Sequence, residues 1–261
     1  MKNVIKKIVA MGLVLSMTGA VAACSKKKGL TVKKGTLTMA TNAYFQPYEY
    51  YEDSKIVGID AEIAEKIAEK LGLELKIVDV EFDSIIAGVQ SDKYDIGMAG
   101  MTVTEDRLKT INFTDSYAKG VQAIIVKEGS EITDADTLLS GDYKVGVQQG
   151  TTGDIYLSSS PEDGGVGEDR VVRFSKGNDA VVALSTGKVD AVVIDNEPAK
   201  SFVAANSGLT ILPTFYTEED YAICVNKNNQ ELLDKINQAL KELTEDGTIA
   251  AIIEKYIPSN S

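Results

Sequence analysis

Short apolar runs alternate along this chain with segments in which apolar residues recur every three or four positions. One such segment holds Ile63, Ile67 and Leu71 at a spacing of four, which predicts an amphipathic helix. We expect Asp60 to cap the start of this helix and Gly72 to end it. The apolar runs predict strands at residues 36–40, 73–78, 94–99, 121–126, 143–147, 171–174, 191–194 and 221–225.

Further helices are predicted at residues 83–90 and from 230 to about 256, with others between the later strands. Strands that alternate with amphipathic helices are typical of α/β proteins with mainly parallel sheets. The sequence therefore predicts an α/β fold.

A short internal sequence similarity indicates two related halves. Residues 85–100 and 180–195 each read as a helix, a short polar turn and a strand, and Asp95 matches Asp190. Chance similarity between two units of this kind is the alternative reading.

We predict two Rossmann-like lobes, one formed by residues 36–120 and 226–261 and the other by residues 121–225. Two hinge strands would join them, with the chain crossing near residue 121 and returning near residue 221.

The N-terminus has the pattern of a secretory signal peptide, predicted to cover residues 1–23. Residues 1–7 carry three lysines and residues 8–23 carry no charge, and that apolar run is shorter than the roughly 20 residues of a spanning helix. The run VAAC, which ends at Cys24, resembles a bacterial lipobox. That resemblance implies cleavage before Cys24 and a diacylglycerol on its thiol, which would anchor the chain on the outer face of the cell membrane. Ordinary cleavage beside an incidental cysteine is the alternative.

Residues 24–35 are predicted to form the lipidated tether, because this stretch is polar, rich in lysine and too poor in apolar residues to pack. A disulfide is excluded if Cys24 is acylated, since Cys224 is the one other cysteine of the chain. Cys224 lies in an apolar run and is expected to be a core residue.

The overall composition narrows the function classes. The net charge of −12 argues against nucleic acid as a partner. The chain contains no histidine, so a catalytic thiol at Cys224 would lack its usual base.

Open α/β sheets bind ligands beyond the carboxyl ends of their strands. Applied to the predicted strands, this rule selects residues 41–45, 99–104 and 148–153, together with Asp195 and Asn196. We expect these four clusters to meet at one cleft.

Arg107 is the candidate for holding a carboxylate. The chain has three arginines against 24 lysines, and a guanidinium can grip a carboxylate with two parallel hydrogen bonds. Thr104 is expected to cap the helix that carries Arg107, whose N-terminus adds a favourable field. The alternative is a surface arginine paired with Glu105 or Asp106.

The second half supplies an anion-friendly turn at residues 150–153, although such turns often only cap helices. Asp195, at the end of an apolar strand, could pair with a ligand ammonium or cap the helix that starts near Asn196, or do both. The aromatic residues of the first half could enclose a ligand side chain or be core, and Tyr48 is expected to be core.

Residues 36–257 resemble the polar amino-acid-binding proteins of ABC importers, the solute-binding protein family 3 with the type II periplasmic-binding-protein fold. Several motifs in the same order carry the resemblance: ATNAYFQPYEY (40–50), VGIDAEIAEKIAEKLG (57–72), EFDSIIAGVQSDKYDIGMAGMTVTEDR (81–107), INFTDSY (111–117), VGVQQGTTG (145–153) and IDNEPA (194–199).

The resemblance implies a role for individual residues. Arg107 would hold the α-carboxylate, helped by the backbone N–H and hydroxyl of Thr102 and by the backbone of Thr152. Asp195 and the carbonyl of Gly100 would take the α-ammonium.

By the same resemblance, the ligand side chain would lie between Phe45 and Phe82, with Ala99 at the pocket floor. The chain departs from the family at Asn42, where members that select basic or amide side chains often carry Asp. It also departs at Tyr44, where a smaller or acidic residue is common.

The missing carboxylate at position 42 favours a neutral polar or sulfur-containing amino acid, although Tyr44, Glu49 or Gln148 could still contact a polar side-chain end. The predicted ligand-binding residues are Asn42, Tyr44, Phe45, Phe82, Ala99, Gly100, Thr102, Arg107, Gln148, Thr151, Thr152 and Asp195.

The predicted function is the capture of a small amino acid by a monomer that needs no cofactor or metal and hands its ligand to an ABC permease. An enzyme is one alternative, because some dehydratases of carboxylic acids share the fold, but no nucleophile with a base is present. A lipoprotein that senses its ligand through a separate receptor is the other alternative.

Overall fold

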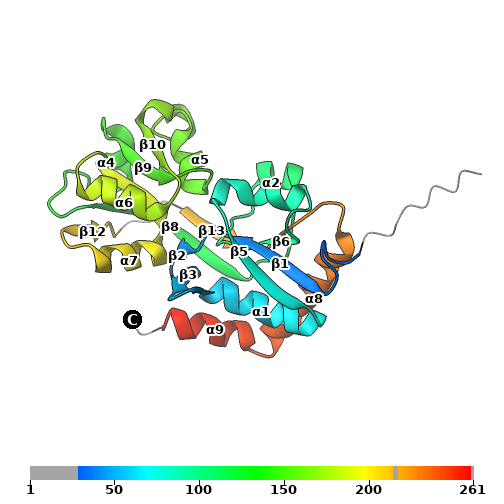
Figure 1. Cartoon of the computed structure of the whole chain (residues 1–261). Coiled ribbons are helices and arrows are strands. Elements are labelled where there is room, and N and C mark those ends of the chain that lie inside the picture. The colour runs from blue at the N-terminus through cyan, green and yellow to red at the C-terminus, as the bar shows by residue number, and fades with distance from the viewer. Residues whose placement is uncertain (1–28, 214–216, 260–261) are drawn as a thin grey trace, which may run out of the picture.

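The computed structural model describes residues 29–213 and 217–259, which form a mixed α/β fold with two main sheets (Figure 1). The predicted signal peptide and Cys24 lie outside the described residues. No helix within the described ranges is both long and apolar enough to cross a membrane.

The first main sheet has the strand order β5, β1, β6, β14, β7. The strand β1 runs parallel to its neighbours β5 and β6, whereas β14 is antiparallel to β6 and β7. The strands are β1 (Thr36–Thr41), β5 (Glu74–Asp79), β6 (Ile96–Gly97), β7 (Asn112–Phe113) and β14 (Cys224–Val225).

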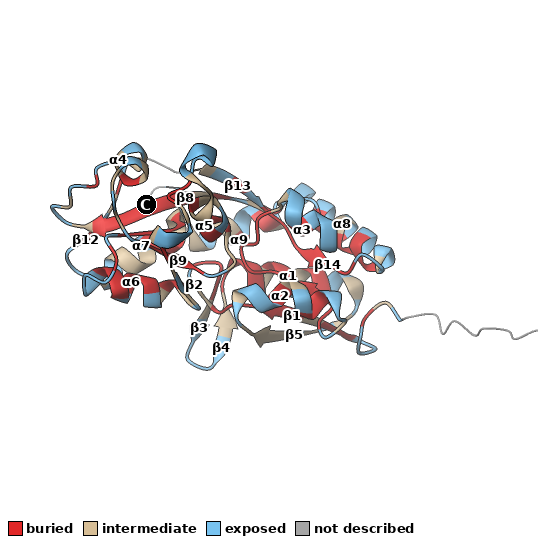
Figure 2. Cartoon of the chain, turned by 90° about the horizontal axis from the view of Figure 1, so that it is seen from above, coloured by how far each residue is buried: buried red, intermediate tan, exposed pale blue. Residues whose placement is uncertain are grey.

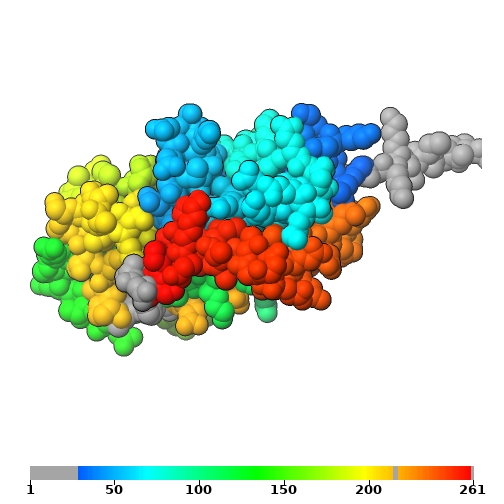
Figure 3. Space-filling model, turned by 90° about the horizontal axis from the view of Figure 1, so that it is seen from below, coloured from blue at the N-terminus to red at the C-terminus, as the bar shows by residue number. Residues whose placement is uncertain are grey.

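Helices cover both faces of this sheet. The long helices α1 (Ile59–Leu71), α8 (Gln230–Glu245) and α9 (Thr248–Tyr256) pack together on one face, and α2 (Ile85–Gln90) packs on the other. Figure 3 shows α8 and α9, in orange and red, running along the first half of the molecule towards the second. Between β6 and β7 lies the short helix α3 (Glu105–Thr110).

The second main sheet has the order β10, β9, β11, β8, β12, with β13 paired to another part of β8. Its strands are β8 (Ala118–Lys127), β9 (Val145–Gln148), β10 (Val171–Phe174), β11 (Ala191–Asp195), β12 (Leu209–Ile211) and β13 (Thr217–Tyr221). Its helices are α4 (Ala135–Ser140), α5 (Thr152–Ser158), α6 (Gly177–Ser185) and α7 (Asn196–Ala205).

The long apolar run of β8 follows from burial on both faces. Ala123 and Ile125 belong to the cluster that includes α6 and α7, whereas Ile124 and Val126 belong to the cluster that includes α4 and α5. Successive side chains of a strand alternate between faces, so a strand covered on both sides is apolar throughout. Figure 2 shows β8 as a largely buried strand, whereas the surrounding helices combine buried and exposed residues.

Two antiparallel strands connect the two sheets. The chain leaves the first sheet after β7 and enters β8, and it returns through β13 to β14. The pairing of β8 with β13 runs from Ala118 and Tyr221 to Gln122 and Thr217.

The structure differs from the expected elements at several places. Residues expected as a loop form a third, small sheet of β2 (Tyr44–Phe45), β3 (Glu49–Glu52) and β4 (Lys55–Val57). The predicted C-terminal helix is two helices, because Gly247 has φ of 81° and interrupts the helical backbone.

The predicted cap at Gly72 is confirmed, because this residue ends α1 in the left-handed conformation. The predicted cap at Asp60 is wrong: Gly58 is the N-cap, and the Asp60 side chain bonds elsewhere. Part of the predicted tether also packs, since Leu30 contacts the core and the backbone N–H of Val32 donates to Asp95.

The internal sequence similarity corresponds to equivalent backbone contacts in the two halves. The Asp95 carboxylate, before β6, accepts hydrogen bonds from the backbone N–H groups of Val32 and Thr38 at 2.6 and 2.7 Å. The Asp190 carboxylate, before β11, accepts one from Lys144 at 2.8 Å. In each half an acid therefore fixes the neighbouring strand at its N-terminal end.

We expect Asp95→Ala to lower the free energy of unfolding by about 3 kcal/mol, because it leaves two backbone N–H groups without their charged acceptor. The matched variant Asp190→Ala should cost about 1 kcal/mol, since that carboxylate is exposed and accepts one backbone bond. Urea unfolding measures both, and equal losses would contradict the distinction.

Candidate functional site

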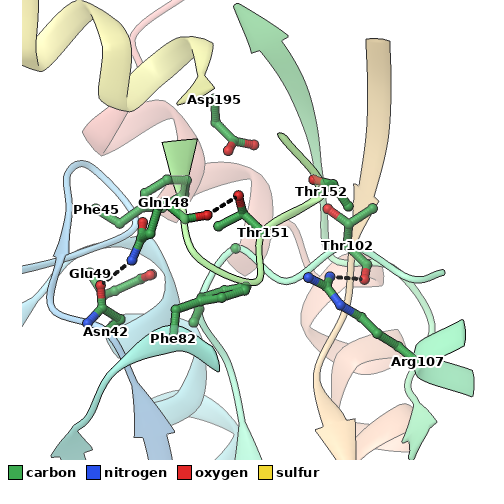
Figure 4. A pocket seen from close by; sticks show the side chains of 12 residues that line it. Asn42, Phe45, Glu49, Phe82, Thr102, Arg107, Gln148, Thr151, Thr152 and Asp195 are labelled. Atoms are coloured by element: carbon green, nitrogen blue, oxygen red, sulfur yellow. Dashed lines mark hydrogen bonds between the residues drawn. The ribbon is translucent and has the colours of Figure 1, made fainter. Parts of the chain in front are cut away.

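A cavity lies between the two main sheets, at the carboxyl ends of several strands (Figure 4). Both halves of the molecule contribute to its wall. The lining residues are Asn42, Phe45, Glu49, Phe82, Ala99, Gly100, Thr102, Arg107, Gln148, Thr151, Thr152 and Asp195. Eleven of these are residues that the sequence predicted, so the four strand-end clusters do meet at one place.

Two aromatic rings form the apolar part of the wall. Phe45 comes from β2, and Phe82 begins a 3-10 turn (Phe82–Ser84) that leads into α2. Gly100 has φ of 53°, and a Cβ atom there would lie 2.8 Å from the Phe45 ring. Glycine is therefore required for this backbone turn and for the close approach of the ring.

Arg107 supplies the positive charge of the cavity. Thr104 caps α3 as predicted, accepting the backbone N–H of Arg107 at 3.2 Å. The guanidinium donates to the carbonyl oxygens of Thr102 at 2.6 Å and Gly150 at 3.0 Å, and it lies 5.5 Å from the centre of the Phe82 ring. Its side chain has no carboxylate partner among the described residues, so the alternative of a surface pair with Glu105 or Asp106 is wrong.

Burial lowers the pKa of Arg107, because the charged form loses its hydration. Arg107 is only 7% exposed and has no anionic partner among the described residues. Burial of such a charge costs folding free energy unless a bound anion neutralises it. The guanidinium is thus suited to receive a carboxylate from a ligand.

Asp195 supplies a negative charge from the other half. It ends β11 and precedes α7, but its side chain does not cap that helix. The carboxylate instead accepts a hydrogen bond from the hydroxyl of Tyr221. Burial, and then the nearby charge of Glu219, raise the pKa of Asp195 to about 7. No lysine or arginine of the described chain forms an ion pair with it, which leaves room for a ligand cation.

The hydroxyl of Thr102 has a different partner from the one expected. It donates to Glu219 at 2.9 Å, so its proton does not point to a ligand carboxylate in this structure. Thr151 caps α5, accepting the backbone N–H of Asp154 at 3.3 Å, and Thr152 is the buried first residue of that helix.

Side chains from the two halves also bond to each other across the cavity. The amide nitrogen of Gln148 donates to the amide oxygen of Asn42 at 2.9 Å, and Gln149 donates to Asp83 at 2.8 Å. With the bond from Arg107 to Gly150, these contacts hold the two halves close together.

Tyr44 is the one predicted site residue that does not line the cavity. Successive side chains of β2 face opposite ways, so when Phe45 points inward Tyr44 points out. Its ring packs against Tyr51 and lies 3.7 Å from the ammonium of Lys176, which belongs to the other half. Tyr48 is core, as expected, with its ring 5.2 Å from that of Tyr221.

Glu49 lines the cavity; the sequence named it as a possible contact for a polar side-chain end, but it was left out of the predicted ligand-binding set. It is 1% exposed, its Oε2 atom has no donor among the described residues, and the acid that acts on it most strongly is Asp60, whose Oδ1 atom is likewise buried without a donor. The Asp60 carboxylate also accepts bonds from the Gly100 backbone N–H and the Tyr117 hydroxyl, each at 2.9 Å. The sequence signal for this pair would have been two acids flanking a turn, which is too common to be diagnostic.

Burial raises the pKa values of both members of the pair. The pKa of Glu49 is raised well above its usual value by burial and then by Asp60, whereas the pKa of Asp60 is raised to about 6. The bonds from Gly100 and Tyr117 favour the ionised form of Asp60, so Glu49 is the member that holds the proton.

The described residues contain no cluster of acids, cysteines or histidines that could hold a metal ion. Cys224 is fully buried in β14, and burial raises the pKa of its thiol to about 12. The expectation that Cys224 is a core residue is therefore confirmed.

Comparisons with known proteins give a consistent result. The sequence profile of bacterial extracellular solute-binding proteins, family 3, matches residues 37–259. The arginine-binding extracellular protein ArtP of Bacillus subtilis (strain 168) is 32% identical over 255 residues, which cover 96% of this chain and 98% of ArtP.

Solved structures agree with the sequence comparison. An ancestral arginine-binding protein bound to arginine is 40% identical, with a TM-score of 0.79 over 86% of this chain and 99% of the other. A structure of an ancestral arginine-binding protein bound to glutamine has the same identity, coverage and TM-score. These matches confirm the predicted type II periplasmic-binding-protein fold.

We expect the contribution of Asp60 to the free energy of unfolding to decrease as the pH rises. The pKa of Asp60 is higher in the folded state than its ordinary 3.8, so its stabilising contribution is complete below about pH 4 and is lost as the pH rises through about 6. Asp60→Asn retains an oxygen for Gly100 and Tyr117 but removes the titration. The stability of this variant relative to the natural protein should rise by about 3 kcal/mol between about pH 4 and pH 8.

Chemical denaturation at several pH values measures this difference, and the exposed Asp142 provides the control Asp142→Asn. If the pH profiles of Asp60→Asn and the natural protein run parallel, the raised pKa of Asp60 is wrong.

Proposed function

Because the chain belongs to the bacterial extracellular solute-binding proteins of family 3, we propose that it captures an L-amino acid in the cavity between its two halves for import by an ABC transporter. The observation that carries this proposal is the buried Arg107 with Asp195 across the same cavity, neither of which has an ion-pair partner among the described residues. A zwitterionic amino acid carries on its α-carbon a carboxylate, which complements Arg107, and an ammonium group, which complements Asp195.

The α-carboxylate would bind the guanidinium of Arg107, which has N–H groups to spare beyond those given to Thr102 and Gly150. Thr151 and Thr152 line the cavity from the second half and would lie against the α-carboxylate. The ligand would thereby bridge both halves.

The α-ammonium would bind Asp195 and the carbonyl oxygen of Gly100. The pKa of Asp195 is raised to about 7 in the empty cavity, and an adjacent cation favours the ionised form. Ligand binding should therefore release a proton from Asp195 below about pH 7.

The ligand side chain would lie between Phe45 and Phe82 and point to Asn42, Gln148 and Glu49. The relatives do not support the preference for a neutral polar or sulfur-containing ligand that the sequence suggested. A carboxyl group buried at this end of the cavity favours a side chain with a cationic end, such as that of arginine. Glu49 thus takes the place of the acid that is missing at Asn42.

Binding would act by a change in the equilibrium between open and closed arrangements. We propose that residues 36–120 with 226–261 and residues 121–225 move as two lobes about β8 and β13. A ligand that contacts both lobes favours the closed arrangement, whose surface an ABC permease would recognise. The family is one of binding proteins, so the dehydratase alternative gains no support.

We propose further that the chain is a lipoprotein held at the outer face of the cell membrane by a diacylglycerol on Cys24, after removal of residues 1–23. The support is the VAAC sequence and the extracellular placement of the family.

We expect Arg107→Ala to weaken amino-acid binding at least about 100-fold, corresponding to about 3 kcal/mol, because the carboxylate loses its bidentate partner. The rise in melting temperature with each amino acid measures this loss, since a ligand at 100 times its dissociation constant adds about 2.7 kcal/mol. Lys109→Ala on the same helix is the exposed control. Equal shifts for Arg107→Ala and the natural protein would overturn the assignment.

Replacing Cys24 should release the protein from membranes. Cys24→Ser is expected to move it from the detergent phase to the aqueous phase in Triton X-114 partition of producing cells, whereas Cys224→Ala should stay with the detergent. Detergent partition of Cys24→Ser equal to that of the natural protein would exclude the lipid anchor.

A further inference from the structure

Two carboxyl groups lie in contact at the end of the cavity that would receive the ligand side chain. Figure 4 shows Glu49 beside Asn42, across the cavity from Arg107. Glu49 comes from β3 and Asp60 from the first turn of α1. One carboxyl oxygen of each, Oε2 of Glu49 and Oδ1 of Asp60, is buried and has no donor among the described residues, and the two acids act on each other by charge and hydrogen bonding. Two carboxylates can share a hydrogen bond only if one of them carries a proton.

The surroundings of this pair determine which acid is ionised. The Asp60 carboxylate receives two hydrogen bonds, whereas no described residue donates a hydrogen bond to Oε2 of the Glu49 carboxyl group. Tyr48 and Tyr117 face Glu49 from the segments before β3 and β8, and the charge of Asp195 acts on it from the end of β11. All of these groups are neutral or acidic, so none of them stabilises a negative charge on Glu49, and Arg107 lies at the far side of the cavity.

We propose that Glu49 and Asp60 share one proton and select the ligand by charge: they keep the proton beside a neutral side-chain end and release it to solvent when a cationic end enters. This inference rests on the amino-acid capture proposed above. The exchange is balanced, because one ligand cation replaces one proton and the two carboxylates then face a single positive charge. Glu49 is thus a specificity-determining residue, and Asp60 positions it.

The proposal has a consequence for affinity as a function of pH. Each pH unit below the titration of the pair should weaken binding of a cationic ligand by up to about tenfold relative to a neutral ligand of the same shape. Arginine and citrulline provide such a comparison, because citrulline replaces the guanidinium by an uncharged urea group. Asp195 would release a proton to either ligand through the α-ammonium, so only the difference between the two reports on the pair.

Isothermal titration calorimetry in buffers of different ionisation enthalpy measures the protons released on binding. At about pH 6, arginine should release up to one proton more than citrulline, and the ratio of their affinities should rise towards about pH 8. Glu49→Gln should abolish both the difference in protons and the preference for arginine. Glu52→Gln, the same change at an exposed position of β3, should leave both intact.

Asp60→Asn gives a second variant that does not depend on Glu49→Gln being folded. It retains an acceptor for Gly100 and Tyr117 but needs no shared proton, so the difference in proton release between arginine and citrulline should decrease. Equal proton release by the two ligands in the natural protein, or tighter binding of citrulline at every pH, would overturn the inference and leave amino-acid capture standing. Binding of no amino acid at all would overturn both.

Discussion

A buried guanidinium without its own carboxylate is the constraint on which the rest of the site depends. Arg107 is almost fully enclosed, and its bonds to the carbonyl oxygens of Thr102 and Gly150 satisfy its geometry but not its charge. Because an uncompensated buried charge is costly, a ligand that brings a carboxylate to this place would stabilise the arrangement seen in the structure. The same bond to Gly150 links the first half of the molecule to the second.

The fold supplies this constraint through its topology. Parallel strands place their carboxyl ends at one edge of each sheet, and β8 and β13 join the two sheets so that these edges face each other. Residues far apart in the chain therefore surround one cavity. Two strands that pair with each other also limit the freedom of the two halves, which would suit the hinge motion proposed above.

The three acids in and behind the cavity wall differ in pKa. Asp195 and Asp60 lose protons near neutral pH, whereas Glu49 holds its proton more strongly because burial and the neighbouring Asp60 oppose its ionisation. Burial is the first cause for all three. A cation that enters the cavity reverses this order, since it stabilises the charged form of whichever acid it contacts. On the proposal made above, the pattern of charge on the ligand would therefore decide how many protons the protein carries.

Local patterns in the sequence were sufficient to predict the α/β fold, the cap at Gly72, the strand-end clusters and Arg107. The reason is that hydrophobic periodicity and the positions of strands along the chain depend on residues that are close in sequence. Pairings between distant residues were decided by tertiary structure alone. The Thr102 hydroxyl meets Glu219, 117 residues away, and Asp60 turns from its helix to Glu49. Such contacts arise because burial leaves each polar group only those partners that the fold brings beside it.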